Sequence, residues 1–86
     1  MDTSNYKNYY KEKISKRQES NMKILNILRD YLNTYPDIRF SQALFNLGIV
    51  RMDEKSFNII DPYYEEPVDV LERVKLNLKK HEPIEL

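Results

Sequence analysis

The only glycine of this chain, Gly48, interrupts the apolar segment RFSQALFNLGIV (residues 39–50) and so limits where a helix can end. Apolar residues recur before it at spacings of three and four, which predicts a helix from about residue 39 to 47. A glycine directly after a helix adopts the left-handed conformation of a C-terminal cap at little cost. We therefore expect a buried corner, in which Phe40→Ala would cost about 3–5 kcal/mol. The residues expected in this core are Phe40, Leu44 and Leu47, with Ile49 packing back beyond the cap.

A second apolar stripe predicts a helix over residues 20–33. Ser20 suits its N-cap, because a serine hydroxyl accepts hydrogen bonds from free amides of the first turn. Pro36 disfavours helical geometry at the residue before it, so this helix should end near Tyr35. Asp37 is then the expected cap of the next helix. The stripe consists of Met22, Leu25, Leu28, Tyr31, Leu32 and Tyr35, flanked by Ile24 and Ile27.

Three further segments complete the expected fold. Residues 4–18 predict a separate polar helix with a thin aromatic face. Residues 49–52 and 56–60 can form a short β-hairpin around the turn DEK. Pro67 suits the first position of a last helix, because its missing N–H is not needed there. The apolar stripe of that helix is Val70, Leu71, Val74 and Leu78.

The length of 86 residues predicts one domain. We expect a mainly α, three- to four-helix domain, with a possible β-hairpin around 49–60. It would comprise a polar N-terminal helix (1–19), a helical core (20–80) and a frayed tail (81–86). The absence of cysteine excludes disulfides and thiolate sites. Neither a signal peptide nor a membrane span is recognisable in the sequence, which predicts a cytoplasmic protein without a membrane partner.

Charge is separated along the chain although the net charge is zero. Residues 1–30 carry seven Lys and Arg and four acids, whereas residues 31–69 carry three Lys and Arg and seven acids. Such a separation steers a protein towards charged partners. A net charge of zero argues against generic nucleic-acid binding.

The densest acidic group lies before and within the start of the last helix. Acids at a helix start are stabilised by the helix dipole, so capping and solvation explain most of them. Neighbouring tyrosines favour protein contact, because the ring buries area while the hydroxyl stays polar. A metal or catalytic site is the remaining alternative. The segment that we predict to bind a partner consists of Asp61, Tyr63, Tyr64, Glu65, Glu66 and Asp69.

The N-terminal helix is the second candidate surface. Its ordinary role would be to pack tyrosine rings on the domain and to leave its lysines in water. Its alternative role is nucleic-acid binding, in which cations contact phosphates and tyrosines stack on bases. The residues concerned are Tyr6, Lys7, Tyr9, Tyr10, Lys13, Lys16 and Arg17, with Lys11 among them. A third candidate is a polar strip formed by Arg39, Gln42 and Asn46.

No catalytic residues, metal ligands or cofactors are predicted. The one histidine, His81, follows two lysines and has no serine or cysteine near it in sequence. It suits a helix C-terminus, where a cation interacts favourably with the dipole.

Two segments, YPDIRFSQALFNLGI and DPYYEEPVDVLERV, resemble a sequence pattern of small proteins that are encoded by bacteria and their phages and have no assigned activity. The resemblance spans roughly residues 25–75. The matching positions are Pro36, Asp37, Arg39, Phe40, Gln42–Ile49, Asp61, Tyr63 and Glu65.

This resemblance implies a phage or mobile-element protein. Small proteins of that class often inhibit host machinery, including RNA-guided defence nucleases. The expected function is therefore non-enzymatic, anti-CRISPR-like inhibition of a host protein or ribonucleoprotein, with possible RNA contact. The alternative functions are a small nucleic-acid-binding regulator that uses the N-terminal helix, and an enzyme. The sequence does not define the oligomeric state.

Overall fold

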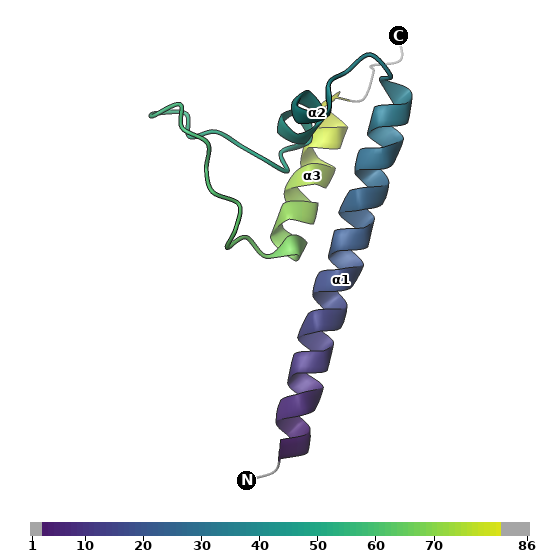
Figure 1. The fold of residues 1–86 in the computed structure, drawn as a ribbon, viewed down its shortest axis with the longest axis vertical. Coiled ribbons are helices and arrows are strands. Elements are labelled where there is room, and N and C mark those ends of the chain that lie inside the picture. Colours follow the sequence, from purple (N-terminus) through teal and green to yellow (C-terminus); the bar gives the residue numbers. More distant parts are fainter. Residues whose placement is uncertain (1–2, 82–86) are drawn as a thin grey trace.

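Three helices and one long connection form the protein (Figure 1). A computed structural model describes residues 3–81, with side chains from Tyr9 to Lys80. Helix α1 spans Thr3–Thr34, α2 spans Phe40–Leu47 and α3 spans Pro67–His81. The mainly α fold predicted from the sequence is confirmed, and Pro67 is the first residue of α3. Apart from the backbone of His81, the predicted frayed tail lies outside the described residues.

Helix α1 is continuous, so the prediction of two helices over residues 4–33 is wrong. Ser20 is not an N-cap but lies within α1, where it is only 7% exposed. The segment around it contains neither glycine nor proline, and nothing in it removes a backbone hydrogen bond. Lys23 donates to the Glu19 carboxylate at 2.9 Å across the expected break. A single serine that could cap a helix therefore does not start a new one here, because its neighbours favour continuation of the helix.

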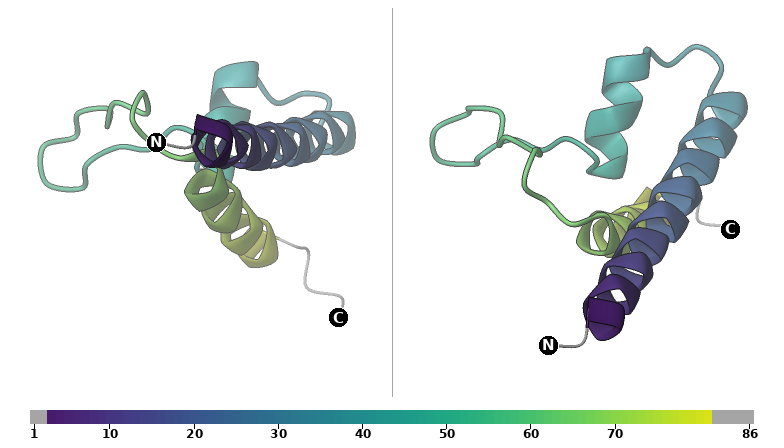
Figure 2. Two further views of the ribbon diagram at one scale, coloured as in Figure 1. Left: turned by 90° about the horizontal axis from the view of Figure 1, so that it is seen from below. Right: turned by 60° about the horizontal axis from the view of Figure 1, so that its bottom comes forward.

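The core lies where α2 and α3 pack against the C-terminal part of α1 (Figures 1 and 2). The predicted stripe of α3 is confirmed. The stripe of α1 is rotated from the prediction, because Met22 and Leu25 are exposed while Ile24 and Ile27 pack against the core. The buried core residues are Leu28, Ala43, Leu47, Val70, Leu71 and Val74.

Helix α2 ends at the predicted corner. Gly48 has φ +78° and its N–H donates to the Phe45 carbonyl at 3.0 Å. The Ile49 N–H donates to the Leu44 carbonyl at 2.9 Å, and Ile49 packs on the core. The glycine cap and the role of Ile49 are confirmed.

Two predictions for the start of α2 are wrong. Phe40 is 58% exposed, because α2 turns Ala43 and Leu47 into the core and leaves the ring at its first position mostly in water. Leu47 is buried as expected, whereas Leu44 is half-buried. Asp37 does not cap the helix. The N-cap is Arg39, whose backbone N–H donates to Gln42 Oε1 at 3.1 Å.

Side chains from α3 complete the corner by bonding the carbonyls that α2 leaves free. Asn77 Nδ2 donates to the Leu47 carbonyl at 3.0 Å, and Arg73 Nε donates to the Gly48 carbonyl at 2.7 Å. A helix end needs such partners when it is buried. The junction between α2 and α3 is therefore polar at its rim and apolar inside.

Residues 48–66 connect α2 to α3 and project from the helices as an open loop (Figure 1). We call residues 51–64 the arm. One antiparallel bridge joins Met52 to Ile59, so the predicted hairpin is reduced to a single pair of residues. Asp53 closes the turn at the tip: its carboxylate accepts from the Lys55 N–H at 2.8 Å. Phe57 follows at φ +59° and is 75% exposed.

The molecule is elongated, with extents of 59 × 32 × 22 Å and a radius of gyration of 16.4 Å. A compact chain of this length has a radius of gyration of about 12 Å. The accessible surface is 7508 Å², whereas a compact monomer of this mass exposes about 5,400 Å². Apolar side chains on the arm and on the N-terminal half of α1 contribute to this excess.

The contrast between Leu47 and Phe40 gives a stability prediction. Leu47→Ala should lower the free energy of unfolding by about 2–5 kcal/mol, because a fully buried side chain leaves a cavity. Phe40→Ala should lower it by less than about 1 kcal/mol, because this ring is mostly in water. Urea unfolding followed by circular dichroism measures both. Equal losses in the two variants would contradict the orientation of α2.

Gly48 gives a second prediction. A Cβ at this position would clash with Asn77 Nδ2, and a left-handed conformation costs a non-glycine residue about 1–2 kcal/mol. Gly48→Ala should therefore lower the free energy of unfolding by about 1–3 kcal/mol in the same assay. The control is Ser41→Ala on the exposed surface of α2, expected to change it by less than about 0.5 kcal/mol. A Gly48→Ala variant as stable as its control would contradict the capped corner.

Candidate functional site

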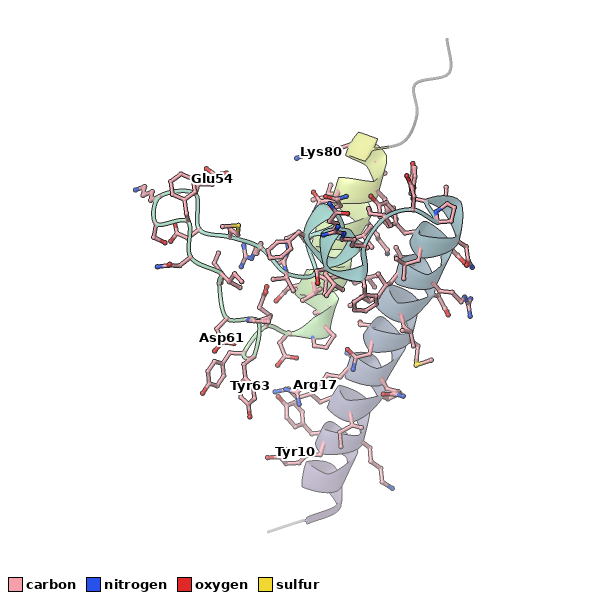
Figure 3. All side chains as sticks on the ribbon, turned by 45° about the horizontal axis from the view of Figure 1, so that its top comes forward. Tyr10, Arg17, Glu54, Asp61, Tyr63 and Lys80 are labelled. Atoms are coloured by element: carbon pink, nitrogen blue, oxygen red, sulfur yellow. The ribbon has the colours of Figure 1, made fainter. Side chains whose placement is uncertain are left out.

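Arg17 and Glu66 bring the two predicted binding segments together. Arg17 Nε donates to Glu66 Oε2 at 2.9 Å and Arg17 Nη2 donates to Glu66 Oε1 at 2.7 Å, across 49 residues of sequence. The pair links the basic helix α1 to the residue directly before α3; Figure 3 shows where Arg17 lies on α1. These bonds lower the pKa of the Glu66 carboxyl. We predicted these two segments from the sequence as separate binding sites, but the ion pair joins them in one surface.

Glu65 is the centre of a second group of charges. Arg73 donates to both of its carboxylate oxygens, at 2.7 and 3.1 Å. Arg51 approaches the same carboxylate at 3.4 Å. The hydrogen bonds from Arg73 lower the pKa of Glu65. Sequence reasoning missed Arg73 and Arg51, since no local pattern shows which cations reach an acid that precedes a helix.

Four tyrosines flank the Arg17–Glu66 pair. Tyr9 and Tyr10 lie two turns before Arg17 on α1, and Tyr63 and Tyr64 come directly before the two glutamates. Tyr63 and Tyr64 are 80% and 86% exposed, and their rings meet edge to face with centroids 4.9 Å apart. Figure 3 shows Tyr10, Arg17 and Tyr63 on the same side of the molecule. We call Tyr9, Tyr10, Tyr63 and Tyr64, with the ion pair between them, the tyrosine surface.

The basic residues of α1 lie beside this surface. Lys13, Lys16 and Arg17 line a shallow pocket of about 280 Å³ together with Glu66 and Val68. Neither of these lysines, nor Lys11, forms an ion pair with a described residue. The side chains of Tyr6 and Lys7 lie outside the described residues. Among the predicted cations of α1 whose side chains the structure describes, Arg17 is therefore the one that forms an ion pair.

The remaining predicted acids serve local geometry. Asp61 accepts from the Tyr63 N–H at 3.0 Å and so turns the chain before the tyrosines (Figure 3). Asp69 lies in the first turn of α3, where the helix dipole favours a negative charge. Neither forms an ion pair with a described residue. The acidic segment thus has two neutralised glutamates and two solvated aspartates.

The predicted polar strip is only partly assembled. Gln42 and Asn46 line one pocket between α1 and α2, whereas Arg39 is not among its lining residues. Asn46 Nδ2 donates to the Tyr31 hydroxyl at 3.2 Å. Gln42 accepts the Arg39 N–H and thereby caps α2.

The side chains that the structure describes include no group of three or more His, Asp or Glu placed to hold a metal ion. Of the helices in the described part of the chain, none is both long enough and apolar enough to cross a membrane.

Comparison with known proteins gives no relative: the chain matches no protein-family model, no curated protein and no solved structure. The resemblance carried by residues 25–75 therefore stays a prediction.

The two glutamates give a prediction on pH. Their folded-state pKa lies below that of the unfolded chain, because Arg73 and Arg17 bond the carboxylates. Such groups add stability that is complete above the ordinary glutamate pKa of about 4.3 and is lost as pH falls through the lowered pKa. We expect the urea midpoint to fall on acidification below about pH 4.3. Glu65→Gln should be less stable than the wild type at pH 7 and should flatten this fall.

The matched control is Glu54→Gln. Glu54 is exposed on the arm (Figure 3) and has no hydrogen bond or ion pair with a described residue. It should retain the acid sensitivity of the wild type between pH 7 and 3. Identical pH profiles for the two variants would show that the contact between Glu65 and Arg73 does not contribute.

Proposed function

We propose that this protein is a non-enzymatic binding protein that covers a site on a host protein or ribonucleoprotein and inhibits it. The observation that carries the proposal is the tyrosine surface, in which exposed aromatic rings from α1 and from the arm flank one ion pair. The surface belongs to a chain whose accessible area exceeds that of a compact monomer. The proposed compartment is the host cytoplasm.

Tyrosine is well suited to such contact. Its ring buries a large area with few rotatable bonds, and its hydroxyl adapts to polar partners. Tyrosine is also enriched among the residues that dominate binding energy at protein interfaces. Tyr63 and Tyr64 are held by the Asp61 turn and by the anchoring of Glu65 and Glu66. That anchoring lowers the entropy lost when a partner binds.

The ion pairs limit how the acidic segment can act. A mimic of nucleic acid needs a row of unpaired negative charges, but Glu65 and Glu66 are bonded by Arg73 and Arg17. The unpaired charges left in the segment are Asp61 and Asp69. We therefore assign the binding energy to the tyrosine rings rather than to the carboxylates.

The finer proposal is that the partner is an RNA-guided defence nuclease. It is supported by the resemblance to small phage-encoded proteins and by the small, elongated shape. In this proposal the tyrosine surface contacts a protein face of the nuclease, and the nearby lysines contact its RNA.

A nucleic-acid-binding regulator is the second candidate. It is favoured by Lys11, Lys13 and Lys16, which have no ion-pair partner within the described residues and lie beside exposed Tyr9. Arg17 contributes little to nucleic-acid binding, because its Nε and Nη2 already donate to Glu66. Affinity that falls steeply with salt would be its signature.

The first test is a pull-down from host lysate, with and without nuclease treatment, followed by binding to the purified partner. Tyr63→Ser combined with Tyr64→Ser should lower affinity at least tenfold, because two residues central to the surface lose their rings. Their high exposure means that the fold should be retained, which circular dichroism can check. A purified RNA-guided nuclease should lose target cleavage when mixed with the wild type.

The matched control is Phe40→Ser, which removes another mostly exposed ring, on α2 and outside the tyrosine surface. It should bind as the wild type does. A double tyrosine variant that binds normally would overturn the proposed surface. Recovery of nucleic acid alone, lost when Lys11, Lys13 and Lys16 are changed to Gln, would favour the regulator instead.

A further inference from the structure

We propose a second binding site, in which the pocket between α1 and α2 holds the guanidinium group of an arginine side chain from a partner peptide. The pocket has a volume of about 430 Å³, within the range of ligand pockets in proteins. It lies at the opposite end of the core from the Arg17–Glu66 pair. Its lining residues are Tyr31, Tyr35, Asp37, Ile38, Gln42 and Asn46.

The electrostatics of this pocket favour a cation. Asp37 contributes a carboxylate that has no hydrogen bond or ion pair with a described residue. The pocket also adjoins the C-terminus of α1, where the helix dipole is negative. The last turn of this 32-residue helix contains no basic residue to offset that charge. No cation of the described chain lines the pocket.

Aromatic rings form one wall. The rings of Tyr31 and Tyr35 have centroids 4.9 Å apart and are tilted by 53°. A cation over the face of a tyrosine gains about 0.5–1 kcal/mol at an exposed site, and arginine uses this contact more often than lysine. Tyr31 is held in place, because its hydroxyl accepts from Asn46 Nδ2.

Two of the polar lining residues offer free acceptor oxygens, whereas Gln42 Oε1 already accepts from the Arg39 N–H. Asn46 uses its Nδ2 on Tyr31, which leaves Oδ1 available. Asp37 adds two carboxylate oxygens. A guanidinium group carries five donors and no acceptor, and its flat face stacks on aromatic rings. An ammonium group lacks that flat face, and a single carboxylate is too few ligands for a metal ion.

The expected source is a peptide rather than free arginine. Free arginine carries an α-ammonium and an α-carboxylate group, two strongly hydrated charges whose desolvation would oppose binding. In a peptide both groups are replaced by neutral amides, which avoid this cost. The site thus recognises an arginine displayed on a protein surface.

The test is a titration of the full chain with N-acetyl-arginine amide, followed by ¹⁵N NMR of the backbone amides. We expect saturable shifts confined to residues 31–46. Asp37→Asn should weaken binding about three- to fivefold, since Asp37 is exposed and an exposed ion pair contributes modestly. Tyr35→Leu should weaken it about threefold. Glu54→Gln and Tyr64→Leu, which alter exposed residues outside the pocket, should bind as the wild type does.

Three further probes test which chemical group the pocket binds. N-acetyl-citrulline amide has nearly the same shape without the charge, and equal binding would overturn cation recognition. Equal binding of N-acetyl-lysine amide would overturn the preference for guanidinium. Tighter binding of free L-arginine would overturn the peptide source. Failure of the tyrosine variants at the first surface would leave these results unaffected, so the two proposals are tested separately.

Discussion

One guanidinium group, that of Arg73, holds both ends of the connection between α2 and α3. Its Nε donates to the Gly48 carbonyl where the connection begins, and its two terminal nitrogens bond the Glu65 carboxylate where it ends. A connection of this length without regular structure is uncommon in a small domain, and such loops are usually functional. The arm can project because Arg73 fixes its base. The planar, always charged fork of arginine suits this role, since it satisfies a carbonyl and a carboxylate at once.

The ion pairs also determine which groups the protein presents to a partner. Arg73 and Arg17 neutralise Glu65 and Glu66, so the acidic segment presents less negative charge to a partner. Its most exposed large side chains are the adjacent rings of Tyr63 and Tyr64. The Arg17–Glu66 pair is nearly half exposed, and an exposed ion pair adds little stability. Its main effect is geometric, because it aligns the start of α3 with the N-terminal half of α1. The proposed tyrosine surface follows from that alignment.

Much of the local structure could be read from the sequence. The helical period of α3, the proline at its first position and the glycine after α2 were recognised because each depends on neighbours within one turn. The apolar stripe of α1 was recognised but its orientation was not. Which side of a helix is buried depends on where its partners pack, and Met22 and Leu25 lie on the side that α2 and α3 leave open. For the same reason Phe40 is exposed although its spacing from Leu47 suits the core.

In the candidate site, too, the sequence determined local features and the packing of the helices determined the rest. The sequence by itself determined that tyrosines precede two glutamates, that lysines and tyrosines share a helix, and that no cysteine is present. Only the tertiary structure decided that Arg17 meets Glu66 and that Arg73 meets Glu65, across 49 and 8 residues. It also decided that Asp37 is a pocket wall and not a helix cap. Periodicity and capping are set by bonds within a turn, whereas the pairing of distant charges depends on how the helices pack.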